Sequence, residues 1–87
     1  NVSELYFFKG ELYRVRNKDN DLTNALEAYQ KSIDLGTPPA SVFKQMALVK
    51  RRLGDTNDAK LLLKKYLEQY PQAEDAKIIE QLIQEMQ

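Results

Sequence analysis

The sequence contains no cysteine and no histidine. Without them the chain has no disulfide, no thiolate nucleophile, no usual set of zinc ligands and no imidazole to move protons. Most enzyme classes therefore lose their best catalytic candidates, and we expect neither a cofactor nor a metal site. Absence of cysteine is compatible with the cytoplasm and with the bacterial periplasm, so the compartment stays open.

Long apolar runs and an excess of one charge are also missing. No stretch approaches the roughly 18 apolar residues that a membrane-spanning helix needs, so we predict a soluble chain without membrane insertion. Lysine plus arginine number 13 and aspartate plus glutamate also number 13, which gives a net charge of zero. The basic runs 50–52 and 64–65 belong to a chain without an overall positive charge, so we expect no nucleic-acid partner.

The residues that are present indicate a small ordered domain rich in helix. Hydrophobic residues make up 43% of the 87 residues and charged residues 30%, which argues against disorder. Apolar residues recur at helical spacing in five segments, at about 3–17, 21–35, 39–53, 56–70 and 73–87. The expected N-caps of the first two helices are Ser3 and Asp21. Pro39 is expected in the first turn of the third helix, and Gly54 and Pro71 are expected to end the third and fourth.

Apolar stripes on these helices predict which faces meet the core. The first segment carries its main stripe at Leu5, Phe8, Leu12 and Val15, and the fifth carries Ala76, Ile79, Ile83 and Met86. Short connections between the helices favour antiparallel neighbours.

The chain also contains an internal repeat. Ala25 and Ala59 lie 34 residues apart in similar surroundings, Asp21–Tyr29 and Asp55–Leu63. Such a period is that of the tetratricopeptide (TPR) unit, a helix-turn-helix, and the chain resembles this family. The matching structural positions are Tyr6, Gly10, Tyr13, Ala25, Tyr29 and Ser32 in the first unit, and Phe43, Met46, Ala47, Ala59, Leu63 and Pro71 in the second.

The resemblance implies an all-α fold in which five antiparallel helices form a right-handed superhelix of helical hairpins, an α-solenoid. It divides the single domain 1–87 into a first repeat at about 3–37, a second at about 40–72 and a capping helix at about 73–87. Gly10 and Ala47 are 37 residues apart rather than 34, which predicts a three-residue insertion near 17–20.

The family resemblance further implies a protein or peptide partner held in the concave groove lined by the first helix of each repeat. The corresponding residues are Glu4, Phe7, Glu11, Arg14, Ser41, Lys44, Leu48 and Arg51. The alternative is that they are ordinary residues on solvated helix faces. Phe7 and Leu48 lie off the main apolar stripes and are either edge packing or exposed anchors for a partner. Glu11 would repel a carboxylate, which excludes the carboxylate clamp of one TPR subfamily.

Two alternative functions stay open. The stretch 63–67, followed by Pro71, Ala73, Asp75 and Ile79, resembles repeat tails of bacterial envelope proteins, including some zinc metallopeptidases, which would make this chain an accessory or docking domain. The first residue, Asn1, is not methionine and favours a piece of a longer or processed chain. The second alternative is a weak homo-oligomer formed through an end face that includes Tyr6 and Tyr13.

Catalysis and calcium binding are weaker interpretations. The carboxylate pairs Glu11 with Glu27 and Asp55 with Asp58 have no neighbouring base, nucleophile or metal ligand, so we do not expect an enzyme. The run from Asp19 begins like a calcium loop but has Asn24 where glycine is needed and Gln30 where a bidentate glutamate is needed.

Overall fold

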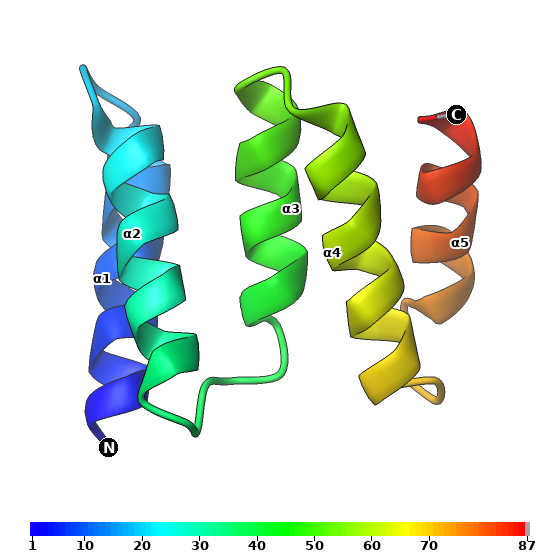
Figure 1. Cartoon of the computed structure of the whole chain (residues 1–87), viewed down its shortest axis with the longest axis horizontal. Coiled ribbons are helices and arrows are strands. Elements are labelled where there is room, and N and C mark those ends of the chain that lie inside the picture. Colours follow the sequence, from blue (N-terminus) through cyan, green and yellow to red (C-terminus); the bar gives the residue numbers. More distant parts are fainter. Residues whose placement is uncertain (87) are drawn as a thin grey trace. The chain divides into compact units, whose positions relative to one another are not determined.

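The computed structural model describes residues 1–86, and over that range the chain is all-α, with five helices and no strand (Figure 1). The helices are α1 (Val2–Arg16), α2 (Asp21–Asp34), α3 (Val42–Arg52), α4 (Thr56–Gln69) and α5 (Ala76–Glu85). This confirms the predicted all-α class and the predicted number and order of helices. No helix within residues 1–86 is long and apolar enough to cross a membrane. The chain divides into two compact units, Asn1–Val42 and Phe43–Gln87.

Two of the predicted N-caps were wrong. Asn1 rather than Ser3 caps α1, because its side-chain oxygen accepts a hydrogen bond from the Glu4 backbone N–H at 2.8 Å. Asn20 precedes α2, and Asp21 lies inside its first turn, where the carboxylate accepts hydrogen bonds from Arg16 and from the Lys18 backbone N–H.

The third and fifth helices begin later than predicted. Pro39 is not in α3, because its carbonyl accepts the Val42 N–H at 3.1 Å and closes one separate turn before the helix. Likewise Ala73 takes part in turns with Tyr70 and Ala76 before α5 begins at Ala76. The short linkers are thus turns rather than first helical residues.

The predicted helix ends agree better with the structure. Gly54 follows α3 with φ +89°, a conformation that side chains disfavour, and the Asp55 N–H returns to the Lys50 carbonyl at 2.9 Å. The Asp55 carboxylate then caps α4 by accepting the Asp58 N–H. Pro71 directly follows Tyr70, the C-cap residue of α4, as predicted.

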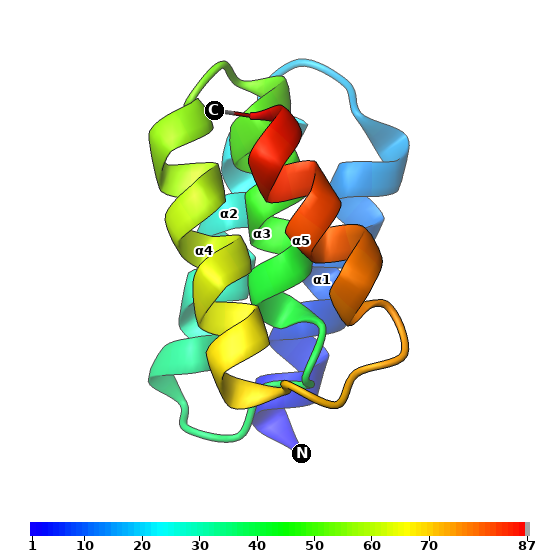
Figure 2. The ribbon, with the colours of Figure 1, turned by 90° about the vertical axis from the view of Figure 1, so that its right-hand side faces the viewer.

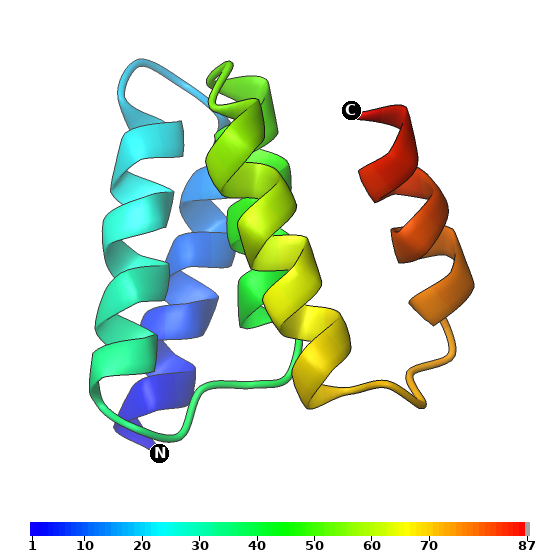
Figure 3. The same cartoon turned by 45° about the vertical axis from the view of Figure 1, so that its right-hand side comes forward.

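In the first unit α1 and α2 form an antiparallel hairpin (Figure 3). A Cβ atom added to Gly10 would lie 2.6 Å from ring atoms of Tyr29, so glycine is what allows the two helices to approach this closely. Ala25 and Tyr29 on α2 are fully buried. The loop between the helices contains two left-handed residues, Asn17 at φ 49° and Asp19 at φ 47°, in the segment where an insertion is predicted.

One apolar stripe lies on the opposite side from that predicted. The buried residues of α1 are Ser3, Phe7 and Gly10. The predicted core stripe is exposed instead, at Leu5, Phe8, Leu12 and Val15. The prediction failed because the hairpin is held by close approach at Gly10 and by hydrogen-bonded polar groups, neither of which hydropathy records.

In the second unit α4 and α5 run antiparallel (Figure 2). Ala59, Leu63 and Tyr66 are the buried residues of α4. Those of α5 are Ile79 and Ile83, as its predicted stripe requires, whereas Ile78 is exposed. Lys50 of α3 lies 3.2 Å from Asp58 of α4 and 3.6 Å from the Asp55 cap, which links the two helices by charge.

Candidate functional site

The predicted groove residues are divided between the two units. Of those in the first unit, Glu4 is exposed, Phe7 is buried, and Glu11 and Arg14 are half-buried. In the second unit Lys44 and Leu48 are half-buried and Arg51 is exposed. Each set is therefore considered within its own unit.

Phe7 is not an exposed anchor. Its side chain is 7% exposed, and its ring centroid lies 5.7 Å from that of the buried Tyr29 at an interplanar angle of 41°. A tilted aromatic pair of this kind stabilises the hairpin by about 1 kcal/mol beyond the area that it buries. Of the two alternatives left open by the sequence, the structure shows the packed one.

Glu11 and Arg14 are occupied within the hairpin. Arg14 donates two hydrogen bonds to the Glu11 carboxylate, at 3.2 and 3.0 Å, and the Tyr29 hydroxyl donates a third. Burial raises the pKa of Glu11, but the hydrogen bonds from Arg14 and Tyr29 outweigh it and hold that pKa below its usual value. Burial and the adjacent Glu11 carboxylate raise the pKa of Tyr29. These groups hold α1 to α2 and leave little hydrogen-bonding capacity for a partner.

Lys44 is engaged in a similar way in the second unit. Its ammonium nitrogen lies 2.7 Å from Asp75 and 5.5 Å from the centroid of the Tyr66 ring, and the Tyr66 hydroxyl donates to Asp75 at 2.8 Å. The hydrogen bonds from Lys44 and Tyr66 lower the pKa of Asp75, and burial with the Asp75 carboxylate raises the pKa of Tyr66 to about 12. A tyrosine, a carboxylate and a cation thus form one cluster in each unit.

The outer face of α1 has a different character, because large apolar side chains lie in solvent there. The exposed fractions are 66% for Leu5, 56% for Phe8, 74% for Leu12 and 72% for Val15. These four residues are called the α1 seam below. Their successive spacings are three, four and three residues, so they occupy one narrow line along the helix.

Opposite charges border the α1 seam. A helix turns about 100° per residue, which places Lys9 and Arg16 along one edge of the α1 seam and Glu4 and Glu11 along the other. Lys9 is exposed and lies within a cation–π distance of Tyr6, at 5.9 Å from its centroid. Arg16 is 61% exposed at its side chain while bonded to Asp21.

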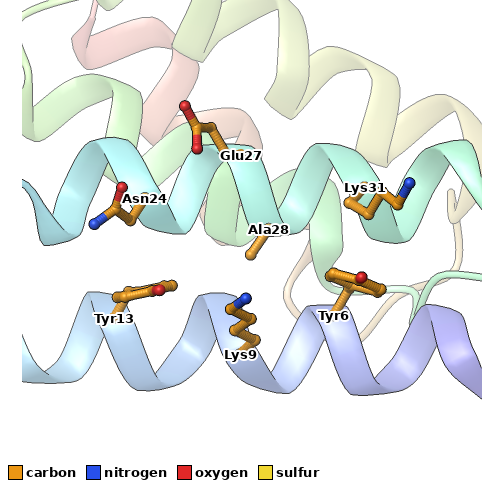
Figure 4. A pocket seen from close by; sticks show the side chains of 7 residues that line it. All are labelled: Tyr6, Lys9, Tyr13, Asn24, Glu27, Ala28 and Lys31. Atoms are coloured by element: carbon orange, nitrogen blue, oxygen red, sulfur yellow. The ribbon is translucent and has the colours of Figure 1, made fainter.

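A hollow between α1 and α2 lies next to the edge of the α1 seam that holds Lys9 (Figure 4). Tyr6 and Tyr13 of α1 stand on either side of it, and Ala28 of α2 points between them. Lys31 reaches over the Tyr6 ring, with its nitrogen 5.9 Å from the centroid, so that ring lies near two ammonium groups. The hollow thus continues the exposed aromatic and basic surface of α1 onto α2. Its lining residues are Tyr6, Lys9, Tyr13, Asn24, Glu27, Ala28 and Lys31.

Sequence reasoning found the four residues of the α1 seam and assigned them to the wrong side. Two signals could have corrected the assignment. The first is the border of the line, with glutamates on one edge and basic residues on the other. The second is Gly10 on the opposite face, because glycine inside a helix indicates close packing there.

Within residues 1–86 no three acidic side chains gather closely enough to hold a metal ion. No family model matches the chain, and no match was found among curated proteins or solved structures.

Proposed function

We propose that this chain is a protein-interaction module and that its docking surface is the α1 seam. The observation that carries the proposal is the exposure of four large apolar side chains in one line. Together they expose roughly 400 Å² of apolar surface, a size at which patches on soluble domains are often functional. The charged borders are typical of the rim of a protein interface, which surrounds an apolar centre.

The α1 seam is a better candidate than the predicted groove. Phe7 is buried, Glu11 and Arg14 bond to each other, and Lys44 bonds to Asp75. Among the groove residues that the structure describes, Leu48 and Arg51 have no such side-chain bond, and the Glu4 carboxylate lies 3.7 Å from the amino group of Asn1. A partner would gain more from the α1 seam, where no internal bond has to be broken.

The tetratricopeptide architecture is retained as part of the proposal. Its support is that the small residues at the repeat positions, Gly10, Ala25, Ala47 and Ala59, are all buried. Small residues at these positions allow the two helices of each hairpin to pack closely. The repeat boundaries and the superhelix are predictions from the sequence.

Site-specific photo-crosslinking tests the proposed surface. A benzophenone side chain is placed at Leu12 in the α1 seam or, as a matched control, at Leu61 on α4, which is 63% exposed. Illumination in cells should give discrete adducts from position 12 and none of the same mass from position 61. Equal labelling at both positions, or none at position 12, would contradict the proposal.

A further inference from the structure

We propose that the occupant of the α1 seam is the α1 seam of a second copy of this chain, with the two helices parallel and in register. The inference rests on the proposed function, because it assigns the partner of that same surface. Its basis is the pairing pattern of apolar and charged residues along the exposed face of α1.

The apolar line has the spacing of a coiled-coil seam. In a heptad, Leu5 and Leu12 take the first core position and Phe8 and Val15 the second, which gives two successive heptads. This period suits a facing helix that crosses at about 20°, whose side chains insert between those of α1. A flat or irregular partner surface would not require such a regular line.

The charges favour a second copy over an unrelated helix. In a parallel pair, each residue on the edge formed by Glu4 and Glu11 faces a residue on the basic edge of the other helix. That residue lies five positions later in the sequence. Glu4 then faces Lys9 of the second copy, and Glu11 faces Arg16 of the second copy. The helix is therefore complementary to itself, because both oppositely charged edges lie on the same chain.

The same charges disfavour the antiparallel arrangement. There the glutamate edges face each other, as do the basic edges, so Glu4 meets Glu11 and Lys9 meets Arg16. Glu4 and Lys9 carry most of the discrimination, because both are exposed, whereas Glu11 and Arg16 are bonded to Arg14 and Asp21 within their own chain. Parallel pairing is the arrangement in which the exposed charges attract.

The charged edges favour two chains over larger assemblies, in opposition to the core line, because leucine at the first core position with the β-branched Val15 at the second would favour more chains. Trimers and tetramers bury the positions that flank the core line, and here those positions hold Glu4 and Lys9. Two heptads bury little area, so we expect a weak dimer with a Kd on the order of 100 µM.

Sedimentation equilibrium over about 10 µM to about 1 mM of the chain measures this association. We expect a monomer–dimer equilibrium that Leu12→Asp weakens at least about tenfold. Leu61→Asp replaces another exposed leucine, which lies on α4, and should leave the dissociation constant unchanged. A chain that stays monomeric at the highest concentration, or equal effects of the two substitutions, overturns the proposal.

Charge exchange tests the orientation. Lys9→Glu should weaken the dimer about three- to tenfold, and the double substitution Glu4→Lys with Lys9→Glu should restore it. In an antiparallel dimer Lys9→Glu would instead strengthen association, because residue 9 would then attract Arg16 of the second copy. Strengthening by the single substitution therefore overturns the parallel arrangement.

Oxidative cross-linking gives a second test of orientation. The sequence has no cysteine, so Val15→Cys provides a unique thiol in the core line. Two such thiols adjoin in a parallel pair and should form a disulfide dimer, whereas they lie about 15 Å apart in an antiparallel one. Absence of a dimer in sedimentation and of a disulfide dimer in oxidation, together with a crosslink at position 12 to another protein, would reject self-pairing and leave the proposed docking surface intact.

Discussion

The helices α1 and α5 both carry a line of apolar residues at helical spacing, yet these lines lie on opposite sides with respect to the core. On α5 the buried residues are Ile79 and Ile83, which belong to its apolar stripe. On α1 the stripe is exposed, and Ser3, Phe7 and Gly10 are buried. A hydrophobic period therefore identifies a helix and a line of apolar residues, but it does not decide which side the core occupies.

The inner face of α1 can be buried because its polar atoms are paired. The Ser32 hydroxyl donates to the Ser3 carbonyl at 2.6 Å, and the Thr37 N–H donates to the Ser3 hydroxyl oxygen at 3.1 Å. Within residues 1–86 no buried side-chain nitrogen or oxygen lacks a hydrogen-bond partner. Burial of paired polar groups costs little, so close packing with Tyr29 decides which face turns inward.

The largest expected effect compares two adjacent phenylalanines of α1. Phe7→Ala removes a buried ring and should lower the free energy of unfolding by about 3 kcal/mol. Phe8→Ala removes an exposed ring and should change it by less than about 0.5 kcal/mol. Urea unfolding at low protein concentration measures both without a contribution from self-association. Equal losses would show that the assignment of inner and outer faces is wrong.

The matching pair on α5 uses two adjacent isoleucines. Ile79 is buried, whereas Ile78 is 68% exposed. Ile79→Ala should destabilise the chain by about 2 to 3 kcal/mol, and Ile78→Ala by less than about 0.5 kcal/mol. Circular dichroism during urea unfolding provides the measurement. A small effect at residue 79 would indicate that α5 contributes little to the core of its unit.

Gly10→Ala tests the close approach of the first hairpin. Alanine favours helix over glycine by about 1 kcal/mol, but the added Cβ would meet the fully buried Tyr29 ring at 2.6 Å. We expect a net loss of about 2 kcal/mol in thermal or urea unfolding. Leu12→Ala on the outer face is the control and should stay within about 0.5 kcal/mol of the parent. A stabilised Gly10→Ala variant would show that the Tyr29 ring can move to accommodate the added methyl group.

The smallest expected effect is on the acid side of the stability profile. Hydrogen bonds from Arg16 and from the Lys18 N–H lower the pKa of Asp21 from its ordinary 3.8 to about 2. The stabilising effect of the ionised carboxylate is present above about pH 4 and is lost as the pH falls towards 2. Urea midpoints measured across this range should fall less steeply in Asp21→Asn than in the parent. Identical slopes would assign the acid sensitivity to other carboxylates.

Local sequence signals predicted much of the fold. Gly54 and Pro71 act as predicted, because helix stops depend on a few neighbouring residues. The starts of α3 and α5 were placed early, because proline and alanine suit a turn as well as a first helical residue. The exposed side of α1 could not be derived from periodicity, since it depends on how closely Gly10 and Tyr29 meet across the hairpin.

The tyrosine and carboxylate clusters also make the stability of each unit decrease at alkaline pH. Tyr29 bonds to Glu11 in the first and Tyr66 to Asp75 in the second, and both phenols have a raised pKa. An unfolded tyrosine ionises near pH 10, whereas Tyr66 in the folded chain keeps its proton until about pH 12. Between these values hydroxide removes a proton from the unfolded chain that the folded chain retains, so the folded state weakens as the pH rises. The phenols of these two clusters thus make the folded state of both units less stable in base.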